Sequence, residues 1–373
     1  MVLCINLTVG STRSRGARDW ASGGWDTGNH VNCLTTDRLR RVVAGPLRFR
    51  RSDERWDTER VDKQLRQPLD RRFGARLLSP RFDPPPNYEA RRLVMDNGDL
   101  ALFAWGDDAY WLGNTETPEA LWRTDKWTFE EAPYPLSRWA QRELLAELAE
   151  SDPWLAAYSY VAWYFLPVLF SKDGRDSTRA FFRNHAAGFP DASREDGLAF
   201  YESVLSATDL DDHRYTMASK LGTSESMDLV RMRATMAEFN TAKLLTDAGY
   251  AYEPEVALDS GYALDFRVAD PSALVEVTRP EPPTRRRAGT PSAALRETVD
   301  GKRNDQLAAH SGAIVFVDCS SFRDGEWQRI ATNRPDAGHE PAVIYRMRPD
   351  GTATGYTCGN PALDLSVPLT EPA

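Results

Sequence analysis

The sequence predicts an α+β N-terminal region, first strand-rich and then helical, followed by an α/β C-terminal domain with elements in the order αβββαβ. Two observations lead to this prediction. The chain of 373 residues is 41% hydrophobic, which suits a globular protein of two or three domains. Its apolar residues also change spacing along the chain, and the second half shows the more ordered succession of helical and strand periods.

The chain is acidic overall, with scarce lysine. Its formal net charge is −9, so binding of nucleic acid would require a local basic patch. Lysine accounts for only six of the 46 basic residues. An acidic excess with few lysines is typical of salt-adapted proteins, whereas codon bias alone would explain the arginines but not the acidic residues.

Residues 1–42 differ in composition from the rest of the chain. They are rich in Arg, Gly, Ser and Thr, carry a net positive charge and show no periodic pattern. They lack the apolar run of a secretory signal. We expect a disordered extension or a gene start placed too early. The predicted units are this extension (1–42), an N-terminal α+β domain of unknown function (43–222) and the C-terminal domain (223–373).

Strands and then helices are predicted within residues 43–222. Leu100–Trp105 and Ala109–Leu112 flank a Gly-Asp-Asp turn, which is a hairpin signal. Another short strand is expected at Trp127–Phe129, and helices at 136–150, 175–188 and 194–207. The uncharged stretch Trp154–Phe170 is short for a membrane span and contains a proline and three tyrosines, so we expect a buried core helix.

The second half has the clearer pattern of elements. It predicts a helix capped by Ser226 and ending near Ala248, strands at 251–258, 262–269 and 273–278, a helix from Thr290-Pro291 to about His310, and strands at 313–317 and 342–345. The four cysteines have no zinc-binding spacing, and a reducing cytoplasm is the simplest interpretation. There is no phosphate-binding G-x-x-x-x-G-K-[ST] loop and no G-x-S-x-G motif.

Two acidic residues lie in the predicted hairpin of strands 262–269 and 273–278. Asp265 and Glu276 have indices of opposite parity, so every register with an odd index sum places both side chains on one face of the sheet. A two-residue turn at Asp270-Pro271 would place them directly opposite each other. Two close carboxylates repel unless a cation lies between them, and Mg²⁺ is a hard ion that prefers such oxygen ligands.

This segment resembles the core of the PD-(D/E)XK nuclease superfamily over residues 230–320. The resemblance rests on the order αβββαβ, on Asp265 in the second strand and on Glu276-Val277-Thr278 in the third. It implies a restriction-endonuclease-like fold and a DNA-hydrolysing site that binds Mg²⁺ or Mn²⁺ through Asp265, Glu276 and the Val277 carbonyl. Glu238, on the preceding helix, would bind a second metal or a water. The whole chain also resembles an uncharacterised haloarchaeal family of unknown function.

The chain departs from the superfamily pattern at Thr278, where a lysine is usual. In some members the lysine lies on the next helix. Here Leu295, Val299, Lys302 and Gln306 follow one helical stripe, which directs Lys302 and Gln306 towards the carboxylates. Lys302 would stabilise the scissile phosphate or the attacking water, and Gln306 would orient it. Arg279 is a second candidate for the cationic role.

A local basic segment could bind the DNA backbone. Residues 279–303 contain more basic than acidic side chains within an acidic protein. The candidate nucleic-acid-binding residues are Arg279, Arg285, Arg286, Arg287 and Arg303. The arginine triplet could equally be a solvated loop, and Glu276 could form a structural ion pair with Arg267 or Arg279.

Two other functions fit the same sequence. A catalytically inactive nuclease fold could bind nucleic acid or protein, and Thr278 favours this alternative. In the other, the aromatic first half is the active part and the nuclease-like half is a scaffold. The sequence predicts no membrane partner and leaves the oligomeric state open.

Overall fold

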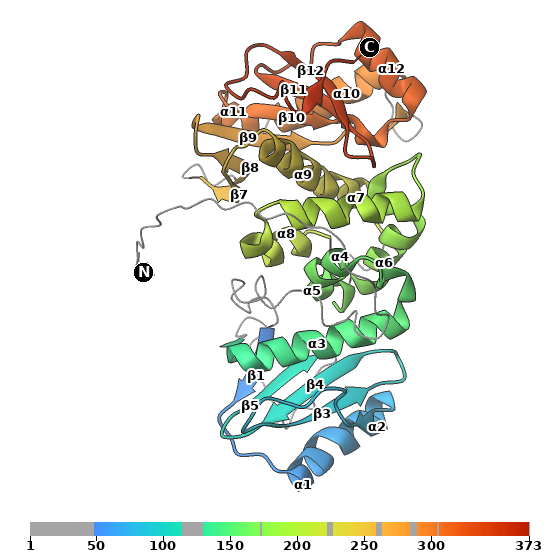
Figure 1. Cartoon of the computed structure of the whole chain (residues 1–373), viewed down its shortest axis with the longest axis vertical. Helices are drawn as coiled ribbons and strands as arrows, with labels where there is room; N and C mark the ends of the chain where they lie inside the picture. Colours follow the sequence, from blue (N-terminus) through green and yellow to red (C-terminus); the bar gives the residue numbers. More distant parts are fainter. Residues whose placement is uncertain are drawn as a thin grey trace, which may run out of the picture.

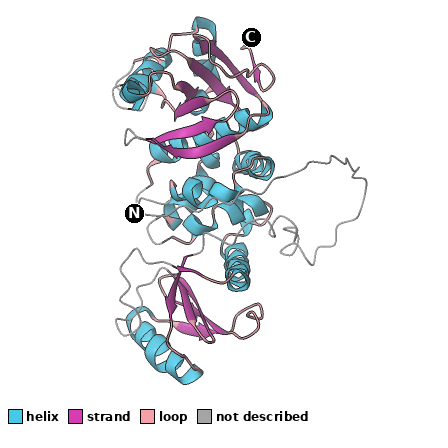
Figure 2. Cartoon of the chain, turned by 90° about the vertical axis from the view of Figure 1, so that its left-hand side faces the viewer, coloured by secondary structure: helices cyan, strands magenta, loops and turns pink. Residues whose placement is uncertain are grey.

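The structure, a computed structural model, describes residues 48–113, 130–171, 174–221, 227–258, 263–283, 289–303 and 306–372. Two sheets are separated by a layer of helices (Figures 1 and 2). This mixed α/β arrangement, with strands first, then helices, then a mixed sheet, confirms the predicted fold class at that level. Residues 1–42, Trp127–Phe129 and Ser226 lie outside the described residues.

The first sheet has the strand order β2-β3-β4-β5-β1-β6. Its elements are β1 Arg48–Ser52, α1 Thr58–Arg60, the π-helix η2 Val61–Arg66, α2 Gln67–Phe73, β2 Arg76–Leu78, β3 Glu89–Val94, β4 Leu100–Trp105, β5 Ala109–Gly113 and β6 Glu130–Glu131. β4 and β5 form the predicted hairpin, with Trp105 paired to Ala109. Every residue of β4 is buried, because η2 and α2 pack on one face of the sheet and α3 on the other.

The central helices connect the two sheets through one continuous apolar core. They are α3 Tyr134–Ser151, the 3₁₀ turn η3 Pro153–Leu155, α4 Ser159–Tyr164, α5 Leu166–Leu169, α6 Arg175–Asn184, the 3₁₀ turn η4 Ala186–Gly188, α7 Arg194–Ala207, the 3₁₀ turn η5 Asp211–His213 and α8 Arg214–Ser219. None of the described helices is both long and apolar enough to cross a membrane.

The sequence predicted one continuous core helix over Trp154–Phe170, and this prediction was wrong. The segment is largely buried, but it forms η3, α4 and α5 rather than one helix. Pro167 lies in the first turn of α5, where a proline fits because the first helical N–H groups have no intrahelical acceptor. The chain therefore turns at Phe165, which ends α4.

The second sheet has the strand order β13-β12-β11-β10-β9-β8-β7 (Figure 1). Its elements are α9 Leu229–Asp247, β7 Tyr252–Ala257, β8 Ala263–Val268, β9 Ala273–Thr278, α10 Pro291–Arg303, α11 Gln306–Ala309, β10 Ile314–Asp318, the 3₁₀ turn η7 Cys319–Ser321, α12 Asp324–Asn333, β11 Ala342–Met347, β12 Ala353–Cys358 and β13 Leu369–Thr370. β7, β8 and β9 are antiparallel neighbours, whereas β9, β10 and β11 are parallel. α9 packs on one face, and α10 and α12 pack on the other.

The helix caps in this half follow local sequence signals, with one correction. Thr290 accepts a hydrogen bond from the Ala293 N–H and caps α10, as predicted. The N-cap of α9 is Asp228, whose carboxylate accepts from the Arg231 N–H, so the helix begins later than a Ser226 cap would place it. Strands β12 and β13 and helix α12 were not predicted from the sequence.

A buried polar network joins α9 to the carboxyl ends of β9 and β10. The guanidinium of Arg279 lies 3.4 Å from Asp318, and both side chains are fully buried. Asp318 also accepts hydrogen bonds from the Asn240 side chain and from the Ser320 N–H, so it caps the end of its strand. Arg279 additionally donates to Ser321. A buried charge pair is tolerated only when its remaining hydrogen bonds are made, as they are here.

We predict that Asp318→Ala lowers the free energy of unfolding by about 3–5 kcal/mol, because it leaves the Arg279 charge buried without its carboxylate. Urea denaturation followed by circular dichroism measures the change. Asp53→Ala is the matched control, since the Asp53 side chain is 85% exposed beside Arg51. An Asp318 variant as stable as this control would show that the network does not stabilise the fold.

Candidate metal centre

Three antiparallel strands bring three carboxylates into one row. The register of β8 and β9 pairs Phe266 with Val275, and its odd index sum places Asp265 directly opposite Glu276, around a turn at Asp270-Pro271. The register of β7 and β8 places Glu255 opposite Asp265, between two paired positions. Opposite residues of antiparallel strands lie on the same side of the sheet, so Asp265 and Glu276 are neighbours.

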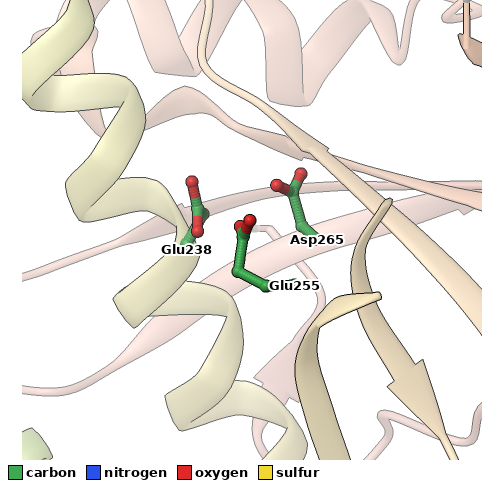
Figure 3. Close-up of side chains that lie close together, drawn as sticks. All are labelled: Glu238, Glu255 and Asp265. Atoms are coloured by element: carbon green, nitrogen blue, oxygen red, sulfur yellow. The ribbon is translucent and has the colours of Figure 1, made fainter. Parts of the chain in front are cut away.

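Glu255 has a left-handed backbone conformation, with φ of 58° inside β7. This region is costly for a residue with a Cβ atom and usually marks a local irregularity of the strand. The distortion brings the Glu255 carboxylate together with those of Asp265 and Glu238, and one oxygen from each lies within 4.8 Å of the others (Figure 3). Sequence analysis missed Glu255, because nothing in the chain signals this conformation.

Glu238 reaches the same cluster from the middle of α9, as Figure 3 shows. The helix packs against the sheet through Met236 and Phe239, which are fully buried. Glu238 itself is only 8% exposed. Burial and the nearby Asp265 carboxylate raise its pKa well above the ordinary value, while the ammonium of Lys220 acts in the opposite direction.

Lys220, which follows α8, supplies an ammonium at the centre of the three carboxylates. Its Nζ lies 2.5 Å from Glu238, 3.7 Å from Asp265 and in close contact with Glu255. Its backbone carbonyl accepts a hydrogen bond from Arg231, which fixes it beside α9. Burial disfavours its charge, but the carboxylates more than compensate and raise its pKa. Sequence analysis missed Lys220 too, although the scarcity of lysine was a usable signal.

Glu276 is the most deeply buried acid of the group, at 1% exposure. Its Oε1 accepts a hydrogen bond from Lys302 Nζ at 2.6 Å, whereas its Oε2 is buried and has no hydrogen-bond partner among the described residues. Burial, and then the charge of Asp265, raise the pKa of Glu276 to about 7, against the effect of Lys302. Such an oxygen can coordinate a hard cation or accept a hydrogen bond from water.

Asp265 lies between the carboxylates that contact Lys220 and the Glu276 carboxylate that contacts Lys302. Its Oδ2 accepts a hydrogen bond from the Val277 N–H at 2.7 Å, which fixes the side chain across β8 and β9. Burial raises the pKa of Asp265, while Lys220 and this backbone donor oppose the rise. Lys302 reaches Glu276 from α10, where Leu295 and Val299 of the same stripe are buried against the sheet. The side chain of Gln306 lies outside what the structure describes.

The cluster contains more negative than positive charge. Among the described residues it comprises the carboxylates of Glu238, Glu255, Asp265 and Glu276 and the ammonium groups of Lys220 and Lys302. Burial is the largest cause of the raised pKa values of Glu238, Asp265 and Glu276, and repulsion by a neighbouring carboxylate adds to it. Their oxygens, including the unpartnered Oε2 of Glu276, suit a hard divalent cation such as Mg²⁺ or Mn²⁺.

The candidate nucleic-acid-binding arginines do not form one surface in the described residues. Arg279 is buried, and its guanidinium donates to Ser321 and to the backbone carbonyls of Arg233 and Gly188, so it is not exposed to a polyanion. Arg285, Arg286 and Arg287 lie outside the described residues. Arg303 is exposed at the end of α10. Glu276 pairs with Lys302, and Arg267 with Glu253, so neither ion pair considered for Glu276 from the sequence forms.

Residues 44–365 match a family described as a family of unknown function, DUF5784. The chain belongs to this family. No curated protein and no solved structure matched the chain. The family match covers the first sheet, the central helices and the second sheet except β13, so the carboxylate cluster lies within the matched region.

We predict that deprotonation of Glu276 makes the protein less stable as pH rises. Its pKa is about 7 in the folded protein and about 4.3 in the unfolded chain, so from about pH 4.5 to pH 7 the folded state holds the additional proton. The stability from this group is therefore complete below about pH 4.5 and is lost as pH rises to about 7.

Denaturation of wild-type protein and Glu276→Gln in chelator, at several pH values, measures this effect. We expect the variant to gain stability relative to wild type over this interval, on the order of 1–3 kcal/mol. Glu297→Gln, at an exposed position of α10, is the control and is expected to follow wild type. A constant difference between Glu276→Gln and wild type across this interval would contradict the assignment.

Proposed function

We propose that the protein binds Mg²⁺ or Mn²⁺ at Glu238, Glu255, Asp265 and Glu276 and hydrolyses phosphodiester bonds in DNA. The observation that supports this proposal is the excess of buried carboxylate over ammonium charge, together with the unpartnered Oε2 of Glu276. The sequence of elements also supports it. α9, β7, β8, β9, α10 and β10 follow one another in the order of a PD-(D/E)XK core, and β9 and β10 are parallel.

The metal would polarise a phosphate oxygen and lower the pKa of a bound water. Asp265 is suited to hold it, because the Val277 N–H fixes one of its oxygens and leaves the other directed at the cluster. In the PD-(D/E)XK superfamily the Val277 carbonyl would be a further ligand. Lys302, with a side chain 37% exposed, can contact both Glu276 and a phosphate arriving from solvent.

Glu276 has a pKa of about 7 without a metal. A divalent cation bound beside it would lower this pKa, so Glu276 would act as an ionised ligand. Thr278 occupies the position where the superfamily usually has a lysine, and it carries no charge. Lys302 would supply the positive charge in its place. Thr278 is buried at the end of β9. The proposal therefore assigns to α10 the cation that the superfamily usually places on the third strand.

We predict that divalent-dependent cleavage of plasmid DNA is lost in Asp265→Asn and in Glu276→Gln. Each substitution keeps the side-chain shape but removes a carboxylate, and losses of about 100-fold or more are expected. Gel electrophoresis of time courses with Mg²⁺, Mn²⁺ or chelator measures the activity.

Glu253→Gln is the matched control, because Glu253 lies on β7 two residues from Glu255 but is exposed and pairs with Arg267. It should retain wild-type cleavage. Cleavage that persists in Asp265→Asn, or in chelator, would contradict the proposed function.

A second function is favoured by the position of Lys220. Its ammonium already contacts three carboxylates, as a permanent structural cation would. Together with Thr278, this contact supports a catalytically inactive nuclease-like fold that binds nucleic acid or protein. Lys220 distinguishes the two functions, since a metal would compete with its ammonium for the same oxygens.

We predict that Lys220→Met increases the affinity for Mn²⁺ in calorimetric titration by about tenfold or more, because removing a competing charge is equivalent to at least one unit of carboxylate pKa. The variant should also be less stable without metal and regain stability when Mn²⁺ is added. If Lys220→Met unfolds and Mn²⁺ gives no recovery, the ammonium is structural and the second function is favoured.

A further inference from the structure

A separate cavity of about 540 Å³ lies where the central helices meet the second sheet. One wall comes from the end of α6, from η4 and from the start of α7. The other comes from α9, from the start of α12 and from the segments after β9 and β10, represented by Pro282 and Ser321. β9 and β10 are parallel, and ligands of α/β proteins often bind outside the carboxyl ends of such strands. None of the carboxylates of the metal centre lines this cavity.

The charged groups that line the cavity are mainly arginines. They are Arg183, Arg194, Arg233 and Arg323, against the single carboxylate of Glu326, and His185 also lines the wall. The acidic partners Glu195, Glu281 and Asp191 contact three of these arginines but do not line the cavity. Arg183 has no acidic partner among the described residues. Glu326 accepts a hydrogen bond from the Arg323 N–H, which fixes its carboxylate at the start of α12.

One of the arginines is built into the wall. Arg233, on α9, is 6% exposed, and its guanidinium is held by Glu281 at 2.8 Å. Its backbone carbonyl accepts a hydrogen bond from Arg279, which connects it to the buried network at the strand ends. A guanidinium held in this way loses little side-chain entropy on binding and can present its planar donors to a phosphate.

The opposite wall has a strained backbone. Ala186 and Ala187 have φ values of 44° and 51°, in the left-handed region that disfavours residues with a Cβ. The turn is held against α7 at Gly197, where a Cβ atom would lie 2.4 Å from the Ala186 carbonyl oxygen. Gly188 accepts a hydrogen bond from Arg279. Strain that is maintained by packing in this way is frequent beside ligand sites.

We infer that this cavity binds a small molecule with a phosphate monoester group, of about the size of a nucleotide. Guanidinium groups recognise phosphate through paired hydrogen bonds, and the arginines surround the space from both walls. Phe189, Pro190 and Pro282 add apolar surface for the rest of the ligand. The volume is within the range of about 300–1,000 Å³ that is typical of small-molecule sites.

Calorimetric titration of the full chain in chelator tests this inference, with AMP and inorganic phosphate as probes and adenosine as the control lacking phosphate. AMP should bind saturably and adenosine should not. Arg183→Glu should weaken AMP binding by about tenfold or more, because it removes a charge-assisted contact and adds repulsion. Arg183 is exposed, so this variant is expected to fold.

Two control variants complete the experiment. Arg76→Glu, at an exposed position of β2 outside the cavity, should bind AMP as wild type does. Asp265→Asn should also retain AMP binding, which separates this site from the proposed hydrolytic centre. The inference is overturned if AMP gives no saturable heat up to about 1 mM. It is also overturned if Arg183→Glu binds AMP as tightly as wild type does, or if adenosine binds as AMP does.

Discussion

The charge imbalance among Glu238, Glu255, Asp265 and Glu276 is the constraint on which the organisation of the second sheet depends. Burial, together with repulsion between neighbouring carboxylates, raises the pKa values of Glu238, Asp265 and Glu276. The structure reduces the repulsion with Lys220 on one side and Lys302 on the other. A divalent cation would remove the remaining excess. A fold selected only for stability would have little reason to gather these acids.

The same sheet supports two chemically different regions. The carboxylate cluster lies across β7, β8 and β9, on side chains fixed by antiparallel pairing. The arginine-lined cavity lies beyond the carboxyl ends of β9 and β10. Between them, the buried pair of Arg279 and Asp318 ties α9 to both strands. This network gives each region a rigid base, because its charged groups cannot move apart without becoming unpaired in the interior.

The parts of the site that could be predicted from sequence are those set by periodicity. The parity of Asp265 and Glu276 fixes their common face in any hairpin with an odd index sum, and the observed register has one. The helical stripe likewise leads from the buried Leu295 and Val299 to Lys302. Both are consequences of regular geometry.

The rest depends on tertiary structure that leaves little local signal. Glu255 joins the cluster because its own backbone is left-handed. Lys220 comes from a segment that packs against α9 only in the folded chain. Arg279 was predicted to bind DNA because basic residues follow it in sequence. In the structure its guanidinium is buried, and its carbonyl and carboxylate partners come from distant elements. The cavity arginines are spread from Arg183 to Arg323, so no motif contains them.

The most direct test of this account is a crystal structure of the protein grown with Mn²⁺, with anomalous scattering measured to locate the ion. The account predicts an anomalous peak within about 2.0–2.6 Å of carboxylate oxygens from Asp265 and Glu276 and from Glu238 or Glu255, with the Lys220 ammonium displaced. It would be contradicted by the absence of any peak there while Lys220 stays in contact with all three of its carboxylates.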